Sequence, residues 1–405
     1  METATVRTEK TVFGGNTIAK IASKTVFIPY ALPDETLSIN IVQHKNDYDN
    51  AEILKIIEPS PYRIKPLCRY YGLCGGCNMM HIEPKFQRKL RTEMLKDAFK
   101  NNKIEAELEI ECIYGPDYNY RSRFQFTDGG LSKKNSNETV KIQECLCAEK
   151  TVNEYLASTE AENRGKGRAH LFGSCFIQGD DKIKIAFADE FKKNNINKNI
   201  HLNKKSKSKE NHYFAGTVIS PENTVTVCLG GKKLSFDVRG FFQSNLFVFE
   251  KVLALIKELL PGGKKILDMY SGCGSISAFL ADKYENVVLI EHNRDALVFA
   301  EQNMAGTKHT SYGLSGEKWV KTCAMYEGNF DACFIDPPRS GMENAVREYL
   351  CKSRIPVILS MSCNPATQAR DIAQLVKAGY SLERLFLLDF YPNSSHIESL
   401  ALLKL

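Results

Sequence analysis

The 405-residue sequence lacks any stretch near the roughly 18 uninterrupted apolar residues that a membrane-spanning helix needs. Its first residues include an acid, Glu2, and have no apolar core, so we expect no secretory signal. Its thirteen cysteines are odd in number and scattered over a large chain, which argues against a disulfide framework. These absences predict a cytoplasmic protein with no membrane partner, in which some cysteines bind metal or act covalently.

The sequence also lacks a strong net charge and any internal repeat. Lys and Arg number 54 against 48 Asp and Glu, a net charge of +6 that permits a nucleic-acid partner without requiring one. With 43% hydrophobic residues, the chain is too apolar to be disordered and long enough for two or three domains. Nothing in it indicates an oligomer, so we expect a monomer.

The N-terminal region consists of short apolar runs broken by turn residues. The runs predict strands at residues 18–22, 25–30, 37–42 and 51–57. Strands of this length and spacing are typical of a small antiparallel barrel, either an OB-type nucleic-acid barrel or another small β domain.

Two further segments differ from this pattern. Apolar residues at helical spacing predict a helix at residues 85–100. The lysine-rich segment from Lys192 to Lys209 has few apolar residues, and we interpret it as a solvated or disordered loop rather than a dedicated RNA contact.

The C-terminal region alternates between strands and helices. Buried strands are predicted at residues 266–270, 287–291, 332–336 and 356–362, with helical stretches between them. This alternation predicts an α/β Rossmann-like domain, in which helices cover both faces of a parallel sheet.

A cluster of cysteines follows the N-terminal region. Its members are Cys68, Cys74 and Cys77. Gly75 and Gly76 let the backbone fold closely, so that the last two thiolates can bind one metal centre. The spacing favours an iron–sulfur site, with zinc as the competing interpretation. Cys145 or Cys147 could supply a fourth ligand.

A glycine-containing turn follows the first C-terminal strand. Asp268 ends the strand, and Gly272 and Gly274 let the backbone approach a nucleotide-like ligand. Glu291, at the end of the next strand, is placed to accept hydrogen bonds from ribose hydroxyls. A nicotinamide dehydrogenase would need a third glycine where Ser277 stands, so the pattern favours S-adenosylmethionine.

Three more side chains stand at strand ends. Asp336 begins an Asp-Pro-Pro-Arg segment after a buried strand, and Arg339 in place of an aromatic residue argues against an exocyclic amine as methyl acceptor. Cys363 lies where a buried strand meets a helix, whose N-terminal amides should favour its thiolate. Glu398 stands at the mouth of a predicted final strand, residues 399–403.

Together these segments resemble the RNA uracil-5-methyltransferases, in particular the iron–sulfur branch that makes 5-methyluridine in ribosomal or transfer RNA. The most specific matches are residues 336–339 and the Ser-Cys-Asn-Pro-Ala-Thr run at 362–367. The resemblance implies a multidomain protein: a TRAM-like OB-type barrel at 1–62, a central α+β iron–sulfur domain at 63–240, and a C-terminal α/β Rossmann-like methyltransferase domain at 241–405.

The resemblance also assigns roles to individual residues. It implies that Cys363 is the nucleophile that adds to carbon 6 of uracil, and that Glu398 is the base that removes the proton from carbon 5. The residues implied to hold S-adenosylmethionine are Gln243, Tyr270, Glu291 and Asp336. Those implied to hold a [4Fe–4S] cluster are Cys68, Cys74, Cys77 and Cys145. Cys147 stays an alternative, because Leu146 replaces a proline that is frequent in the family.

Several functions remain open from the sequence. The barrel and cluster together favour ribosomal RNA, most simply 23S rRNA, over transfer RNA as substrate. A zinc-containing RNA-binding protein with a degenerate methyltransferase fold is a different possibility. A radical S-adenosylmethionine enzyme would need a Cys-x-x-x-Cys-x-x-Cys run, whereas five residues separate Cys68 from Cys74.

Overall fold

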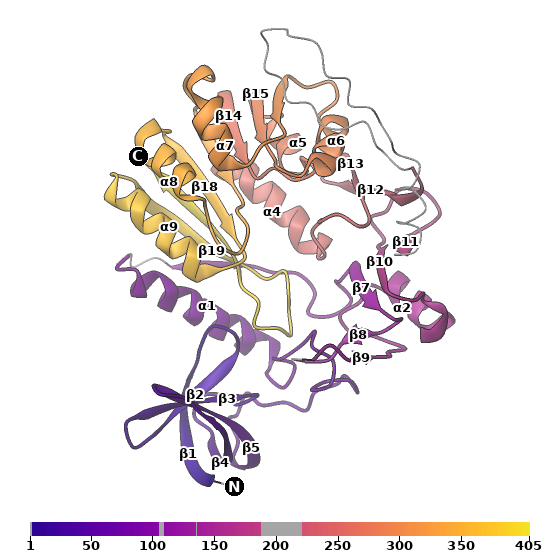
Figure 1. The fold of residues 1–405 in the computed structure, drawn as a ribbon, viewed down its shortest axis with the longest axis vertical. Coiled ribbons are helices and arrows are strands. Elements are labelled where there is room, and N and C mark those ends of the chain that lie inside the picture. Colours follow the sequence, from indigo (N-terminus) through magenta and orange to yellow (C-terminus); the bar gives the residue numbers. More distant parts are fainter. Residues whose placement is uncertain (1, 105–108, 135, 188–220) are drawn as a thin grey trace. The chain divides into compact units, whose positions relative to one another are not determined.

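The computed structural model describes residues 2–104, 109–134, 136–187 and 221–405 (Figure 1). The segment from Lys192 to Lys209 lies outside these residues, so the interpretation of it stays a prediction. The chain divides into two compact units, which are described separately. The first comprises Met1–Ala98, Leu131–Val140 and Tyr391–Ile397, and the second comprises Phe99–Gly130, Lys141–Phe390 and Glu398–Leu405.

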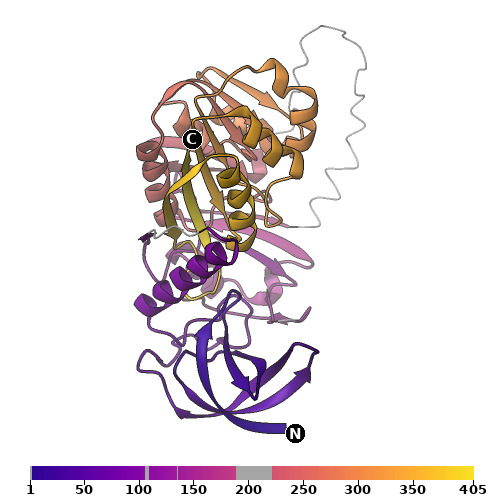
Figure 2. The same ribbon diagram turned by 90° about the vertical axis from the view of Figure 1, so that its left-hand side faces the viewer.

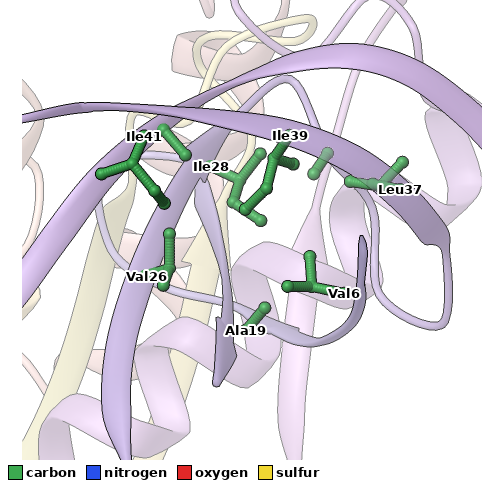
Figure 3. Close-up of a cluster of buried hydrophobic side chains, with 9 residues drawn as sticks. Val6, Ala19, Val26, Ile28, Leu37, Ile39 and Ile41 are labelled. Carbon is green, nitrogen blue, oxygen red and sulfur yellow. The ribbon is translucent and has the colours of Figure 1, made fainter. Parts of the chain in front are cut away.

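The first unit contains a closed five-stranded barrel, which confirms the predicted small barrel but not its purely antiparallel pairing, because the third and fifth strands pair in parallel. Its strands are β1 (Glu2–Thr11), β2 (Asn16–Ile21), β3 (Lys24–Pro29), β4 (Thr36–His44) and β5 (Tyr48–Glu58), in the order β1-β2-β3-β5-β4. Alternate side chains of each strand point inward, and Figure 3 shows the resulting cluster, which includes Val6, Ala19, Val26, Ile28 and Ile39. The barrel therefore has its own hydrophobic core.

Strand β1 was not among the predicted strands. Its inner face carries Val6 but also Thr8 and Thr11, which are 2% and 5% exposed. The Thr8 hydroxyl donates to the Leu32 carbonyl at 2.5 Å, and the Thr11 hydroxyl lies 2.9 Å from that of Thr17. These hydrogen bonds offset the cost of burying the hydroxyls, so threonines occupy positions where the hydrophobic pattern requires apolar residues.

Three further elements begin in or belong to the first unit: α1 (Pro84–Asn101) and the paired strands β8 (Leu131–Ser132) and β9 (Thr139–Val140). Helix α1 confirms the helix predicted at residues 85–100. Its buried side chains include Leu90, Met94 and Leu95, at the spacing of one helix face.

The segment Tyr391–Ile397 is held in the first unit by hydrogen bonds around Asn393. The Asn393 carbonyl accepts from the Met79 amide at 3.0 Å, and the Asn393 amide donates to Gln87 Oε1 at 2.8 Å. Gln87 is 1% exposed. The segment Tyr391–Ile397 therefore supplies hydrogen-bond partners for Met79 and for the buried Gln87.

The second unit is built on an eight-stranded sheet. Its strands, in spatial order, are β16 (His309–Tyr312), β15 (Tyr284–Ile290), β14 (Gly263–Met269), β17 (Ala332–Ile335), β18 (Val357–Ser362), β20 (Glu398–Lys404), β19 (Ser381–Leu388) and β6 (Ile110–Ile113). All neighbours pair in parallel except β20, which is antiparallel to β18 and β19. The strands predicted in this region are confirmed, together with the alternating α/β architecture.

Helices cover both faces of this sheet (Figure 2). They are α4 (Leu246–Leu259), α5 (Ser277–Leu280), α6 (Arg294–Asn303), α7 (Gly316–Thr322), α8 (Asn344–Ser353) and α9 (Pro365–Lys377), with the 3₁₀ turn η3 (Ala324–Tyr326). Helix α4 packs on α5, whereas α8 packs on both α7 and α9.

The stretch of chain between the cysteine cluster and α4 contains further short strands. It forms a three-stranded sheet of β11 (Ile183–Phe187), β10 (Arg168–Gly173) and β7 (Arg123–Thr127), and a hairpin of β12 (Thr224–Leu229) and β13 (Lys232–Asp237). Helix α2 (Lys150–Ser158) and the turns η1 (Ala161–Asn163) and η2 (Pro221–Asn223) were not predicted. Neither was the pairing of β6 with β19.

Among the residues that the structure describes, no helix is both long enough and apolar enough to cross a membrane.

One buried ion pair stabilises the barrel. Glu35, which is 0% exposed, accepts hydrogen bonds from the Leu32 and Ser60 amides and from Arg63 at 2.5 and 2.7 Å. We expect Glu35→Ala to lower the free energy of unfolding of the barrel by about 3 kcal/mol, because it leaves the Arg63 charge uncompensated. Circular dichroism during urea denaturation measures this change.

The matched control is Glu9→Ala, which removes an exposed carboxylate from β1. Its transition should coincide with that of the wild type. Fluorescence of Trp319, the single tryptophan, reports on the second unit and should be unchanged in both variants. Equal transitions for Glu35→Ala and Glu9→Ala would show that the pair contributes nothing.

Candidate active site

The register of the parallel strands gathers three of the predicted residues. Met269 at the end of β14 pairs with Ile290 of β15 and with Ile335 of β17, so the three strand ends form one row. The residues that follow them are Tyr270, Glu291 and Asp336. They therefore leave the sheet at the same edge, where ligands bind in open α/β sheets.

The antiparallel strand β20 brings the two remaining catalytic candidates to this edge. Ser362, the last residue of β18, pairs with Ser399 of β20. Cys363 follows Ser362 and Glu398 precedes Ser399, so the register places Cys363 and Glu398 opposite each other. Residues 35 positions apart in sequence are thus joined by one strand pair.

Acidic groups dominate the electrostatics around Cys363. Burial, with the charges of Glu398 and Asp336, raises the pKa of the Cys363 thiol to about 11, although Arg339 opposes this. Burial likewise raises the pKa of Asp336 to about 7. The pKa of Glu398, which is 7% exposed, is raised well above its usual range by burial and by Asp336, and lowered somewhat by Arg339.

The pKa of Cys363 thus moves opposite to the expectation that the α9 amides favour its thiolate. Asn364 caps α9, and its side chain accepts hydrogen bonds from the Ala366 and Thr367 amides at 3.1 and 3.4 Å. Two of the helix N-terminal donors are therefore already used by the cap. The remaining favourable charge comes from Arg339 and is outweighed by burial and the two acids.

The loop after β14 is braced by Glu291. Its carboxylate accepts hydrogen bonds from the Gly272 amide at 2.9 Å and from the Asn293 amide at 2.6 Å. Gly272 and Gly274 have φ values of +57° and +71°, a region that favours glycine. Glu291 and the two glycines therefore fix the conformation of this loop.

Tyr270 takes a left-handed conformation, with φ of +63°. Its hydroxyl lies 3.4 Å from both the Glu343 Oε2 and the Glu343 amide nitrogen. Glu343 Oε2 also accepts from the Glu317 amide of α7 at 2.7 Å. Tyr270 is thus fixed by contacts beyond its own loop.

Two buried side-chain oxygens, one on a predicted site residue and one beside another, lack a hydrogen-bond partner in the described part of the chain. Gln243, which precedes α4, is 6% exposed, and its Oε1 has no hydrogen-bond partner in the described part of the chain. The same holds for the buried Ser271 hydroxyl, next to Tyr270. Because buried polar atoms are normally hydrogen-bonded, these orphans fit a site that is completed by a polar, nucleoside-like molecule.

The predicted cluster ligands fall in both units. Cys68, Cys74 and Cys77 belong to the first unit, and Cys145 belongs to the second. Within residues 2–104, 109–134, 136–187 and 221–405, no three side chains of His, Cys, Asp or Glu are gathered as a metal site. In the first unit, the Gly76 amide donates to Cys74 Sγ at 3.5 Å.

The two candidate fourth ligands differ in exposure. Asn153 brackets Cys145, accepting from its amide at 2.8 Å and donating to its carbonyl at 2.9 Å. Cys145 is partly exposed, whereas Cys147 is 3% exposed. Cys145 is therefore more exposed to solvent than Cys147.

Sequence reasoning missed the contacts that hold the segment after Asp336. Asp371 of α9 is 0% exposed and accepts from the Met342 amide at 2.7 Å. The one sign of this in the sequence is the glycine at position 341. Its φ is +82°, and a Cβ there would lie 2.5 Å from Asp371 Oδ2. Spacing alone gives no indication that this loop folds onto α9.

The chain is similar in sequence to known proteins. A family model described as tRNA (Uracil-5-)-methyltransferase matches residues 317–405, and one described as Conserved hypothetical protein 95 matches residues 248–356. A relative from Treponema denticola, described as an uncharacterized RNA methyltransferase, is 34% identical, and the match covers 100% of both chains. The 23S rRNA (uracil(1939)-C(5))-methyltransferase RlmD of Aliivibrio salmonicida is 28% identical over 95% of this chain and 92% of its own.

A solved structure has the same fold. The crystal structure of Pyrococcus abyssi tRNA (uracil-54, C5)-methyltransferase in complex with S-adenosyl-L-homocysteine matches with a TM-score of 0.73 and 21% identity. The match covers 99% of this chain and 100% of that one. This fold, together with the Treponema denticola relative that is 34% identical, defines a multidomain methyltransferase.

Within that class, the chain belongs to the RNA uracil-5-methyltransferase family. The expected family resemblance is thereby confirmed.

Asp268, at the base of this edge, makes stability depend on pH. Burial raises its pKa to about 7, although a hydrogen bond from Ser277 opposes this. Between about pH 4 and pH 7 the folded protein keeps a proton that the unfolded chain has lost, so stability falls as pH rises through that window. We expect Asp268→Asn to make this fall shallower, gaining up to about 4 kcal/mol over wild type across the window, while Asp336, whose pKa is also raised, keeps its own part of the fall.

Urea denaturation followed by Trp319 fluorescence, repeated across that pH window, measures the difference. Asp295→Asn, which removes an exposed carboxylate from α6, should keep the pH dependence of the wild type. Parallel curves for Asp268→Asn and wild type would contradict the raised pKa.

Proposed function

We propose that this protein methylates carbon 5 of a specific uridine in RNA, through a covalent bond between Cys363 and carbon 6 of the base. The observation that carries this proposal is the β18–β20 pair, which sets Cys363 opposite Glu398 at the edge reached by Asp336. A thiol and a base facing each other at a ligand-binding edge are what this chemistry requires.

The reaction needs a nucleophile because carbon 5 of uracil attacks alkyl groups poorly. Addition of the Cys363 thiolate to carbon 6 makes the ring enolate-like, so that carbon 5 can take up a methyl group. The adduct then carries a proton on carbon 5 and a bond to sulfur. Removal of that proton by Glu398 expels the thiolate and restores the ring.

The surrounding charges adjust these two groups. The burial that raises the pKa of Glu398 also makes its carboxylate a stronger base once it is ionised. Arg339 lowers the pKa of both Cys363 and Glu398, so it favours the ionised forms that the reaction uses. We propose Arg339 as the cation that supports the thiolate.

We propose S-adenosylmethionine as the cofactor, held by Gln243, Tyr270, Glu291 and Asp336. When bound, it would supply the methyl group. Support comes from the unpartnered Oε1 of Gln243, the braced loop beside Glu291, and the methyltransferase fold. Because hydrogen bonds already hold Glu291 and Tyr270, these two side chains need little ordering when the cofactor enters.

For the substrate, we propose ribosomal RNA, most simply 23S rRNA, with the barrel of residues 1–62 gripping the backbone and flanking bases. Support comes from relatives named as 23S rRNA methyltransferases. Transfer RNA is the alternative, given the name of the Pyrococcus abyssi enzyme. In either RNA, the target base must leave its stack to reach Cys363.

We further propose that Cys68, Cys74, Cys77 and Cys145 hold a [4Fe–4S] cluster in a central region, residues 63–240. The spacing of the first three thiols and the amide hydrogen bond to Cys74 Sγ support this proposal. No step of the methyl transfer is assigned to the cluster.

The covalent step can be tested with RNA that carries 5-fluorouridine. Fluorine cannot leave as a proton does, so the wild-type protein, given S-adenosylmethionine, should stay attached to the RNA on a denaturing gel. Cys363→Ala should give no shifted band. Separate reactions with ribosomal and transfer RNA identify the substrate class.

Glu398→Gln extends this test to natural RNA. Without its base the adduct cannot resolve, so a shifted band should accumulate on RNA with ordinary uridine. Glu285→Gln, which alters an exposed carboxylate on β15, should leave turnover as in the wild type. Absence of any band with either fluorinated RNA would refute the uracil-5 chemistry and favour an RNA-binding protein.

The metal proposal makes a separate prediction. Protein purified without oxygen should contain iron and acid-labile sulfide, and Cys74→Ala and Cys145→Ala should each lose most of both. Cys147→Ala should retain them, because Cys147 is buried and Cys145 is presented by Asn153. Zinc in place of iron, or loss in Cys147→Ala alone, would overturn the assignment.

A further inference from the structure

The loop that carries Arg339 is bonded to the helix that follows Cys363. The Arg339 carbonyl accepts hydrogen bonds from Asn364 Nδ2 and Thr367 Oγ1, both at 3.2 Å. Asn364 directly follows Cys363 and caps α9. The start of α9 therefore holds both the Arg339 loop and the residue next to Cys363.

The next peptide units of the loop are held by charged groups. Arg370 Nη2 donates to the Ser340 carbonyl at 3.0 Å and to Asp371 Oδ1 at 2.6 Å. Asp371 Oδ2 accepts from the Met342 amide at 2.7 Å. Arg347 also bonds Asp371, at 2.8 Å, and the Met342 carbonyl, at 3.1 Å.

Gly341 allows the loop to approach α9 this closely. A Cβ at Gly341 would lie 2.5 Å from both Arg370 Nη2 and Asp371 Oδ2, and 3.1 Å from the Thr367 Cβ. Any larger residue would have to push the loop away from the helix, and its φ of +82° disfavours other residues as well.

We propose that Arg370 is a positioning residue: with Thr367 and Asp371, it holds residues 339–342 on α9 so that Arg339 faces Cys363. This inference rests on the proposed role of Cys363 and deepens it. The charged groups that face Cys363 are Glu398 from β20, and Asp336 and Arg339 after β17. Displacing Arg339 leaves two acids beside the thiol without their opposing charge.

Arg370 suits a test better than its partners do. Its side chain is exposed at the surface, whereas Asp371 is buried against Arg347, so Arg370→Ala leaves the Asp371–Arg347 ion pair intact. Gly341→Ala disturbs the packing of the loop on Arg370 and α9 by a change in the loop instead of the helix. Lys377→Ala removes an exposed cation from the far end of α9 and serves as the control.

The readout is the rate at which iodoacetamide alkylates Cys363, followed by mass spectrometry across a pH series without RNA or cofactor. Arg339→Ala should lower the rate near about pH 8 at least about threefold, because each pKa unit changes the thiolate fraction about tenfold. Arg370→Ala and Gly341→Ala should shift the pH profile in the same direction, and Lys377→Ala should not shift it. With RNA and cofactor, Arg370→Ala should lower kcat and leave the KM for S-adenosylmethionine unchanged.

Two outcomes would overturn the proposal. One is an Arg370→Ala protein with native Trp319 fluorescence and the wild-type alkylation profile. The other is a uniform change of rate at every pH, which would indicate altered access rather than altered charge. Failure of the proposed function is separate, because it would appear in the fluorouridine assay, either as no adduct with the wild type or as an adduct that persists in Cys363→Ala.

Discussion

The antiparallel pairing of β18 with β20 is the constraint on which the site depends. A purely parallel sheet gathers the carboxyl ends of its strands, and this brings Tyr270, Glu291 and Asp336 to one edge. Only a reversed strand can present its first residue there. Strand β20 does so, and the Ser362–Ser399 register aligns its first residue with the end of β18. One reversed strand thus adds an acid to an edge that otherwise receives only residues that follow strands.

Three buried acids at this edge hold their protons more tightly in the ligand-free protein than free carboxylic acids do. Asp268, Asp336 and Glu398 all have raised pKa values, because burial disfavours their ionised forms. A cationic ligand would reverse that preference by supplying the missing charge. The sulfonium of the proposed cofactor is such a cation. The site is therefore suited to couple proton release to occupancy, since the acids lose protons most readily when a positive group lies beside them.

The sequence predicts most of the features that lie in continuous segments. Strands β14 and β18, the turn at Gly272 and the residue Cys363 each carry a local pattern, and the sheet follows from their alternation. Features that depend on distant partners were missed. Strand β6 pairs with β19 across more than 270 positions in sequence. In β1, buried threonines interrupt the apolar alternation by which an inward-facing strand is recognised. The predicted direction of the Cys363 pKa shift was wrong, because burial and the charges of Glu398 and Asp336, which are distant in sequence, raise the pKa of the thiol.

The division of the chain has a consequence for its synthesis. The first unit is not one continuous stretch, because the segment Tyr391–Ile397 belongs to it and follows β19 of the second unit. Until that segment leaves the ribosome, Gln87 lacks the Asn393 partner that it has in the complete unit. The barrel strands emerge before β19, yet their unit is completed only after β19 has been made. Between these two events, Gln87 can bond only to nearby residues such as the Ile82 carbonyl or to water, so the polar contacts of the first unit stay incomplete.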